Sequence, residues 1–405
     1  MPKLVPVNLL LACGLLAGCA EPGQPRLATA GDWISSELVS GPSQTPPDHP
    51  VTVAPAASAV PTNNPPPVTS PRSVETWVDL RNWCKANGLR APELLPSTVP
   101  TAYRLTTAQG NLVVRAGSRN ATWHNLEVLL GFPVQIYNGR PWLHFLDLEK
   151  TIRPLLTPAV AGSPTRNYLI VLDPGHGGND TGARSIADSH CEKEFTLDWA
   201  RRTAALLGSE GVQVLLTRTN DSELSLSNRV ALAESSKADI FVSLHFNSAG
   251  AKTGEYGLET YCLTPSGMPS AVTRGFADDA RASFPNNAFD AENLQFAIGV
   301  HHALLETSGS HDRGVRRARF LTVLRGQQRP AILVEGGYLS NDREARLIAS
   351  APYRQKLAVA LASGLVQSLQ LAIAQSAPAM PNASADSADG IKMASEPAVS
   401  SHALP

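Results

Sequence analysis

The sequence predicts an α/β protein: a mostly parallel, twisted sheet with helices on both faces, preceded by a small β-rich α+β domain. Between residues 167 and 375, short runs of Val, Ile and Leu alternate with longer helix-prone segments. Such apolar runs are typical of parallel strands buried on both faces. Residues 73–157 instead hold short strand-like segments around a strong hairpin signal. We therefore expect two folded units of different size.

The composition excludes several classes of protein. The 405 residues include 34 Lys and Arg against 35 Asp and Glu, a formal net charge of −1. Binding to nucleic acid through bulk charge needs a clustered positive field, so we expect no nucleic-acid partner. No apolar run reaches the roughly 20 residues of a membrane-spanning helix. At roughly 150 residues per domain, the length allows two domains plus tails, and we expect a monomer.

The first residues are typical of an export signal. Lys3 precedes a short apolar stretch at residues 9–16, which ends in Leu16-Ala17-Gly18-Cys19 and resembles a bacterial lipobox. We expect residues 1–18 to be a lipoprotein signal peptide and Cys19 to be lipidated, which would anchor the exported protein to a membrane. Ala20 favours the outer membrane, facing the periplasm, if the cell is Gram-negative. The alternative is an ordinary signal peptide with an incidental cysteine.

Two segments lack the apolar periodicity of a folded unit. Residues 19–72 are rich in proline, with ten prolines between Pro42 and Pro71, and should form an extended tether behind the lipidated cysteine. Residues 376–405 are small and polar and predict a disordered tail.

Three cysteines remain in the predicted folded units: Cys84, Cys191 and Cys262. An odd number allows at most one disulfide within the chain. A Cys191–Cys262 bond would join two parts of the larger unit, and the sequence leaves that pairing open.

In the small unit, residues 73–157, the sequence predicts a helix at 74–87 and strands at 112–114 and 134–137. Asn138-Gly139 is a strong signal for a two-residue hairpin, whose second strand would continue through residues 142–145.

The stretch from residue 118 to residue 148 distantly resembles the small N-terminal domain of copper amine oxidases, which recurs as an accessory module on cell-wall enzymes. Trp123, Trp142 and Tyr137 would then either line a glycan-binding face or be buried in the core of this unit.

The larger unit alternates strands with helices. The predicted strands are residues 168–173, 212–217, 240–244, 258–263, 320–324 and 331–334. The predicted helices start at residue 192 or cover 226–236, 271–283, 291–307, 342–350 and 353–374.

Chemically active side chains follow three of these strands. His176 lies in Asp-Pro-Gly-His-Gly-Gly after the first strand, His245 ends the central strand, and Glu335 ends the last. The carboxyl ends of parallel strands meet at one edge of a sheet, where ligands bind. Glu192 begins the helix that follows the first strand. Two imidazoles and a carboxylate are a common ligand set for a catalytic zinc ion, with a fourth position left for water.

The motifs around these residues resemble the zinc-dependent N-acetylmuramoyl-L-alanine amidases of the Amidase_3 family. The matching segments are residues 171–178, 192–193, 216–218, 226–229, 243–245, 313–315, 323–324, 331–335 and 340–341. The resemblance implies that His176, Glu192 and His245 bind Zn²⁺ and that Glu335 is the catalytic carboxylate. The substrate would be peptidoglycan, in cell-wall remodelling or daughter-cell separation. The chain departs from the family in minor ways at Phe246 and at Gly336-Gly337, which could reshape the substrate groove but remove no ligand.

Alternatives accompany these assignments. Glu194 competes with Glu192 as a ligand, and Glu192 itself has a structural explanation as a carboxylate in the first turn of a helix. The protein could be a catalytically inactive tethered peptidoglycan-binding protein, or a zinc peptidase or deacetylase with another substrate. Intact His176, Glu192, His245 and Glu335 disfavour the first, and the match along the motifs disfavours the second.

Four further histidines and a cluster of four arginines have no predicted role in the site. We expect His190, His301, His302 and His311 to be surface or secondary residues. Arg313, Arg316, Arg317 and Arg319 should form a solvated face, unless one of them binds a peptide carboxylate.

Some relatives in this family carry a helix that blocks the zinc until an activator protein removes it. The insertion between residues 263 and 301, with its predicted helix at 271–283, has room for such an element. A long loop at this place is also ordinary in an active enzyme.

Overall fold

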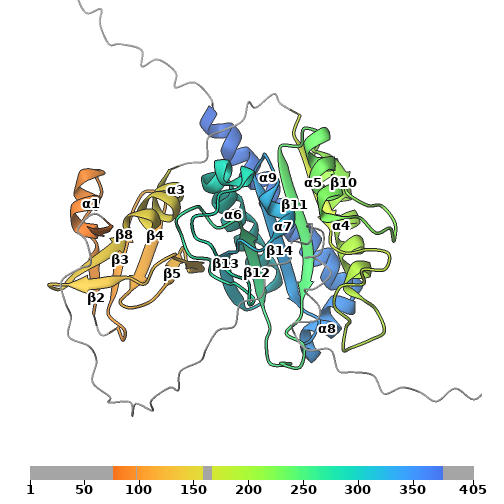
Figure 1. The fold of residues 1–405 in the computed structure, drawn as a ribbon, viewed down its shortest axis with the longest axis horizontal. Helices are drawn as coiled ribbons and strands as arrows, with labels where there is room; N and C mark the ends of the chain where they lie inside the picture. Colours follow the sequence, from red (N-terminus) through yellow and green to blue (C-terminus); the bar gives the residue numbers. More distant parts are fainter. Residues whose placement is uncertain (1–75, 97, 158–166, 377–405) are drawn as a thin grey trace, which may run out of the picture.

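A computed structural model describes residues 76–96, 98–157 and 167–376 (Figure 1). The predicted signal peptide, Cys19, the tether and the C-terminal tail lie outside the described residues. Within the described part of the chain, no helix has the length and apolar character needed to cross a membrane.

The larger unit is built on a mixed sheet whose central strands are all parallel, in the order β10-β9-β11-β14. Next to them, β12 runs antiparallel to β14 and parallel to β13. The strands are β9 (Leu169–Pro174), β10 (Gln213–Leu216), β11 (Ile240–Asn247), β12 (Leu258–Cys262), β13 (Asp312–Arg317) and β14 (Ala331–Tyr338). The predicted mostly parallel α/β sheet is confirmed.

Helices cover both faces of this sheet, because successive strand residues point to opposite sides. Ile170 and Leu172 of β9 belong to the core that α4, α6 and α9 complete, whereas Val171 between them packs into a second core with residues of α5 and α7. The helices are α4 (Glu192–Ser209), α5 (Leu226–Ser235), α6 (Asp290–Ser308), α7 (Thr322–Arg325), α8 (Asp342–Ala349) and α9 (Ala351–Ser376), with a 3₁₀ turn, η3 (Pro285–Phe289), before α6. The central strands thus lie between two helical layers.

The small unit has two sheets. Strands β2 to β6 form an antiparallel meander, and β1, β8 and β7 form a second, three-stranded sheet. At the predicted hairpin, Asn138 and Gly139 have φ of 48° and 66°, as a type I′ turn requires. The elements are β1 (Trp77–Asp79), α1 (Leu80–Ala86), β2 (Glu93–Leu95), β3 (Ala102–Thr106), β4 (Asn111–Arg115), β5 (Asn120–Trp123), β6 (Leu126–Leu129), β7 (Gln135–Tyr137), β8 (Arg140–His144), α2 (Phe145–Asp147), η2 (Leu148–Ile152) and α3 (Arg153–Leu156).

The two units share one continuous sheet. Val128 of β6 pairs with Val315 of β13, so the meander extends the larger sheet to eleven strands (Figure 1). The Arg317 guanidinium of β13 donates to the Thr151 hydroxyl at 2.7 Å. Lys150, beside Thr151, forms a 3.1 Å ion pair with Asp290 of α6. The small unit is therefore packed against the larger one through main-chain pairing and polar contacts.

Two predicted elements are wrong, and a third begins later than predicted. Residues 271–283 form no helix, residues 320–324 form no strand, and the helix predicted at 74–87 begins only at Leu80, after a short strand. Residues 322–325 form the short helix α7, with Val323 and Leu324 buried. Short apolar runs do not distinguish a buried strand from a buried helical turn, and tertiary packing decides between them.

The predicted solvated arginine face is also wrong. Residues 312–317 form β13, and Arg317 and Arg319 are each only 4% exposed. Arg313 donates to Glu259 at 2.7 Å through Nε, and Arg319 donates to the Met268 carbonyl at 2.7 Å. A strand rich in arginine gives no apolar alternation, so the sequence pattern did not reveal it.

His301 is buried as well, contrary to the prediction, and its imidazole contacts the Thr260 hydroxyl and the Asp312 carboxylate at 3.0 and 2.9 Å. His190 and His302 are surface residues, with side chains 56% and 41% exposed.

The three described cysteines, Cys84, Cys191 and Cys262, are free and buried. The Cys191–Cys262 disulfide, left open by the sequence, is therefore not formed.

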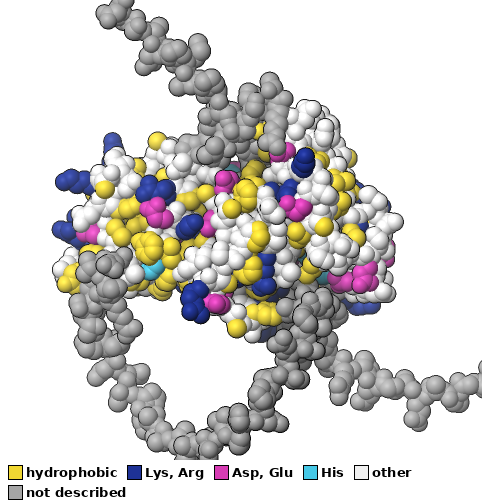
Figure 2. Space-filling model, turned by 45° about the horizontal axis from the view of Figure 1, so that its top comes forward, with side chains coloured by type: hydrophobic (Ala, Val, Ile, Leu, Met, Phe, Trp, Pro, Cys, Tyr) yellow, Lys and Arg dark blue, Asp and Glu magenta, His cyan; other side chains and the backbone are white. Residues whose placement is uncertain are grey.

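The aromatic residues proposed for a glycan-binding face do not share one. Trp123 is buried on β5 of the large sheet, whereas Tyr137 and Trp142 contact each other edge to face on the three-stranded sheet. Hydrophobic side chains nevertheless gather on the small-domain side of the molecule, at the left of Figure 2. Tyr137 and Phe145 are among the exposed large apolar residues, at 37% and 39%.

Candidate metal centre

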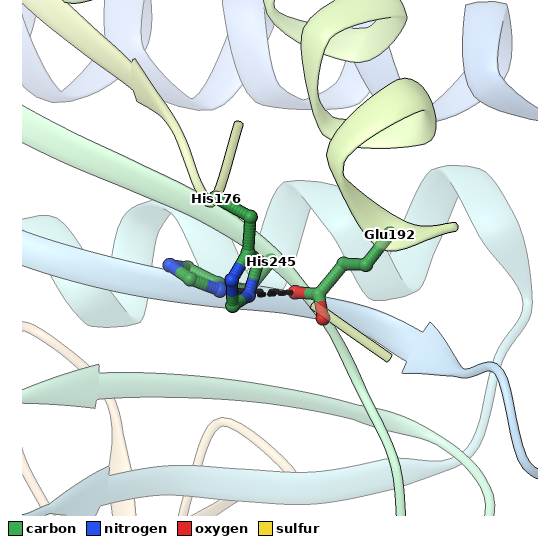
Figure 3. A group of neighbouring side chains, drawn as sticks. All are labelled: His176, Glu192 and His245. Carbon is green, nitrogen blue, oxygen red and sulfur yellow. Dashed lines mark hydrogen bonds and ion pairs between the residues drawn. The ribbon is translucent and has the colours of Figure 1, made fainter. Parts of the chain in front are cut away.

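Three predicted ligands meet at the carboxyl ends of the central strands. His176 follows β9, Glu192 is the first residue of α4, and His245 lies in β11. One donor atom from each lies within 4.8 Å of the other two, and Figure 3 shows the side chains pointing toward one another. Glu192 Oε1 is 3.1 Å from His176 Nε2 and 3.0 Å from His245 Nδ1.

The His176 ring is fixed from its far side. Its Nδ1 lies 2.8 Å from both carboxylate oxygens of Asp180, which leaves Nε2 facing Glu192. A carboxylate in this position selects the tautomer of a metal-binding histidine and orients its ring. Asp180 was not predicted from the sequence, although its place four residues after His176 in the same glycine-rich loop was a usable signal.

Glycine is required in this loop for space. A Cβ atom at Gly182 would lie 2.6 Å from His176 Cδ2 and 2.7 Å from Glu192 Oε2. A Cβ atom at Gly175 would lie 2.4 Å from His245 Cε1. Any side chain at either position would displace the predicted ligands.

Glu192 is held by the backbone and is almost fully buried. Its two carboxylate oxygens accept the N–H groups of Ala183, at 2.9 Å, and Phe246, at 3.0 Å. Burial by itself raises the pKa of Glu192, but His176 and His245 outweigh it, and the pKa is lowered. Glu194, the competing ligand, instead accepts the Cys191 N–H at 2.8 Å and caps α4.

The two imidazoles respond to the same carboxylate. Burial by itself lowers the pKa of His176 and His245, but contact with Glu192 raises both, with Asp180 adding to the effect at His176. The cluster therefore attracts positive charge, which a proton or a metal cation can supply.

Glu335 lies beside this cluster. Its residue on β14 pairs in register with His245 on β11, its side chain is 7% exposed, and its Oε2 is buried without a hydrogen-bond partner among the described residues. Burial raises the pKa of Glu335 to about 7. Buried polar atoms are normally satisfied, so an orphaned carboxylate oxygen here indicates a functional role.

Known proteins are similar to the part of the chain that holds these four residues. Residues 170–367 match the Amidase_3 family, described as N-acetylmuramoyl-L-alanine amidase. The N-acetylmuramoyl-L-alanine amidase AmiA of Salmonella typhimurium is 31% identical over 219 residues, which cover 49% of this chain and 75% of that protein. This chain belongs to the Amidase_3 family.

Other amidases match over a similar part of the chain. AmiC of Escherichia coli is 31% identical over 242 residues, 54% of this chain, and the match spans 57% of AmiC's own length. Among solved structures, the catalytic domain of CwlV, an N-acetylmuramoyl-L-alanine amidase from Bacillus (Paenibacillus) polymyxa var. colistinus, is 31% identical with a TM-score of 0.42. That similarity covers 50% of this chain and 99% of the CwlV chain.

Phe246 and Gly336, where the sequence predicts departures from the Amidase_3 pattern, both lie in the core. Phe246 is 1% exposed and its ring lies 5.3 Å from that of Trp199. A Cβ atom at Gly336 would lie 2.7 Å from the Phe246 ring and 2.9 Å from the Trp199 ring. The large residue at 246 therefore fills the space that a side chain at 336 would need.

A buried ion pair supports the loop that carries His176 in this amidase-family domain. Arg229 Nη1 donates to Asp173 Oδ1 at 2.6 Å, and Arg229 Nη2 donates to the His176 carbonyl at 2.8 Å. Thr217 and Ser243 donate their hydroxyls to Asp173 at 2.6 and 2.8 Å. The network joins β9, β11, α5 and the residue that follows β10, and it holds the loop that carries His176.

Proposed function

We propose that this protein is a zinc-dependent amidase that hydrolyses the bond between the lactyl group of N-acetylmuramic acid and the L-alanine of peptidoglycan. The observation that carries the proposal is the placement of His176, Glu192 and His245 around one point, with the unpartnered carboxylate of Glu335 beside them. Membership of the Amidase_3 family supports the choice of substrate.

The residues present fit a zinc ion. Two imidazole nitrogens and a carboxylate oxygen match the ligand chemistry of catalytic zinc and leave a position for water. Asp180 holds the His176 ring, and the Glu192 carboxylate is fixed by two main-chain N–H groups. The three ligand positions are therefore set before a metal arrives.

Each side chain has a separate task in the proposed hydrolysis. Bound zinc would act as a Lewis acid, which polarises the scissile carbonyl and lowers the pKa of water. Glu335 takes the proton of the water molecule that attacks the carbonyl carbon. When the carbon–nitrogen bond breaks, Glu335 passes this proton to the leaving nitrogen of L-alanine. The proton is thus transferred from water to the amine, and the carboxylate is regenerated.

The products of digestion test the proposal. We expect purified full-length protein with zinc to release free stem peptides from sacculi and to leave intact glycan strands, as detected by mass spectrometry. A chelator should abolish this release. Cleavage within the stem peptide would indicate a peptidase, and loss of acetyl groups a deacetylase. Binding to sacculi without any cleavage would indicate an inactive peptidoglycan-binding protein.

We also propose that Cys19 is acylated and that the protein is exported and anchored to a membrane. Acyl chains hold a protein at a membrane without a spanning helix, and the proline-rich segment would give the enzyme reach toward the cell wall. Replacing Cys19 by serine should move the protein into soluble fractions, measured by immunoblotting after fractionation. The purified variant should digest sacculi normally, because anchoring raises local concentration without changing the site. Retention of the variant in washed membranes would contradict acylation.

A further inference from the structure

Arg274 extends from the long segment between β12 and η3 toward the candidate site. Arg274 and Gly275 both have left-handed backbone angles, with φ of 46° and 81°, which turn the chain at this point. The residue is exposed, yet its guanidinium lies 5.4 Å from the Phe320 ring centre and donates to Asn247 Oδ1 over 3.4 Å. Asn247 lies two residues after His245 on β11, so Arg274 reaches the strand that holds a proposed zinc ligand.

The guanidinium retains donors for a ligand. Of its five N–H groups, one donates a long hydrogen bond to Asn247 Oδ1 and one interacts with the Tyr261 hydroxyl, so most of the donors are left for a ligand. The nearby buried carboxylate of Glu259 is already satisfied, because it accepts from Arg313, Asn247 and Tyr261 at 2.7, 3.0 and 2.7 Å. Burial by itself lowers the pKa of Arg274, but Tyr261, Glu335 and Glu259 outweigh it, so the residue keeps its positive charge.

The other arginines near the site already bind acceptors within the protein. Arg313 forms ion pairs with Glu255 and Glu259, both at 2.7 Å. Arg218 donates to the carbonyl groups of Pro174 and Gly175 at 3.0 and 2.8 Å, and Arg229 is paired with Asp173. Arg274 therefore combines exposure, proximity to Glu335 and unused donors.

The proposed substrate carries an anion at a matching place. In peptidoglycan, L-alanine is followed by D-glutamate linked through its side chain, which leaves its α-carboxyl group free. That carboxylate is about one peptide unit, roughly 4–6 Å, from the scissile nitrogen. A guanidinium binds a carboxylate through two parallel hydrogen bonds, which fixes both position and orientation.

We infer that Arg274 binds the free carboxylate that follows L-alanine in the stem peptide and so aligns the scissile amide with Glu335. The inference rests on the proposed amidase function. It predicts that the enzyme prefers stem peptides whose D-glutamate is not amidated. The segment in which the sequence left room for a blocking helix would thus supply a substrate-binding residue.

The test compares two soluble muropeptides that differ only in whether the α-carboxyl group of D-glutamate is free or amidated. For the zinc-loaded full-length protein, kcat/KM should be roughly 10- to 100-fold higher on the acid than on the amide. Arg274→Gln should lower kcat/KM on the acid by a similar factor, mainly through KM, and change the value on the amide less than about twofold. Arg274→Lys should retain part of the preference, because it keeps the charge and loses the planar fork. Arg281→Gln, at a 91% exposed side chain of the same segment, is the matched control and should change neither value.

Three results would overturn the inference. Equal losses on both substrates would show that Arg274 acts through Glu335 and not on the carboxylate. A gain on both substrates would show that Arg274 obstructs the site. Equal kcat/KM values of the unaltered protein on acid and amide would exclude recognition of the carboxylate while leaving the amidase function intact. If the unaltered protein cleaved neither muropeptide at the lactyl–alanine bond, the proposed function itself would be wrong, and this inference with it.

Discussion

Replacing Glu335 by glutamine is expected to lower kcat by roughly 10²- to 10⁴-fold while the protein keeps about one zinc ion per chain. Glutamine preserves the size of the side chain and removes its ability to accept the proton of water. Glu335 is not among the three residues whose donor atoms converge, so its replacement should leave the ligands in place. Zinc content by elemental analysis and turnover on sacculi check the two halves of this prediction.

The control for that experiment is His245→Ala, which should lose zinc as well as activity because it removes one of three ligand atoms. Asp180→Asn tests the support of the His176 ring and should weaken zinc affinity by about 10- to 100-fold. Equal zinc loss in the Glu335→Gln and His245→Ala variants would mean that Glu335 holds the metal or the fold, contrary to the role proposed here.

Replacing Asp173 by asparagine is expected to lower the free energy of unfolding by about 3–5 kcal/mol, measured by urea denaturation at neutral pH. Asp173 and Arg229 are 1% and 3% exposed, so the variant leaves a buried guanidinium without its counter-ion. The matched control is Glu149→Gln, which removes a half-exposed partner of Arg153 and should cost less than about 1 kcal/mol.

The same residue predicts a dependence on pH. Burial by itself raises the pKa of Asp173, but Arg229 and the hydroxyls of Thr217 and Ser243 outweigh it and hold the pKa below its ordinary value. The ionised carboxylate therefore stabilises the folded state above a pH of about 4, its ordinary pKa, and this contribution is lost as pH falls. The stability difference between the unaltered protein and Asp173→Asn should narrow as pH decreases from about 5 to 3. A difference that stayed constant over this range would contradict the assignment of the effect to the charge.

Much of the larger unit could be predicted from the sequence because its signals are local. Runs of Val, Ile and Leu predict buried strands, and three of these strands are followed by or end in a histidine or glutamate that can bind a metal or transfer a proton. Since parallel strands place their carboxyl ends on one edge, the order of strands alone brought His176, His245 and Glu335 together. The first turn of α4 added Glu192, and the structure separates it from Glu194 by the direction each side chain takes from the helix.

Other features could not be predicted because they depend on partners far away in the chain. β13 has no apolar alternation, and its arginines are buried only because Glu259, Thr151 and main-chain carbonyl groups receive them. Phe246 packs against Trp199 in the core, in space that is free only because Gly336 carries no side chain.

The sequence by itself determined the α/β class, the family resemblance and the four residues proposed for catalysis, since each is encoded in a short segment whose direction a parallel sheet dictates. Only the tertiary structure decided that the small domain extends the catalytic sheet through Val128 and Val315, and that Arg274 lies near Glu335. Both depend on residues more than fifty positions apart in the chain, which strand pairing, packing and charge compensation bring together and no local pattern predicts.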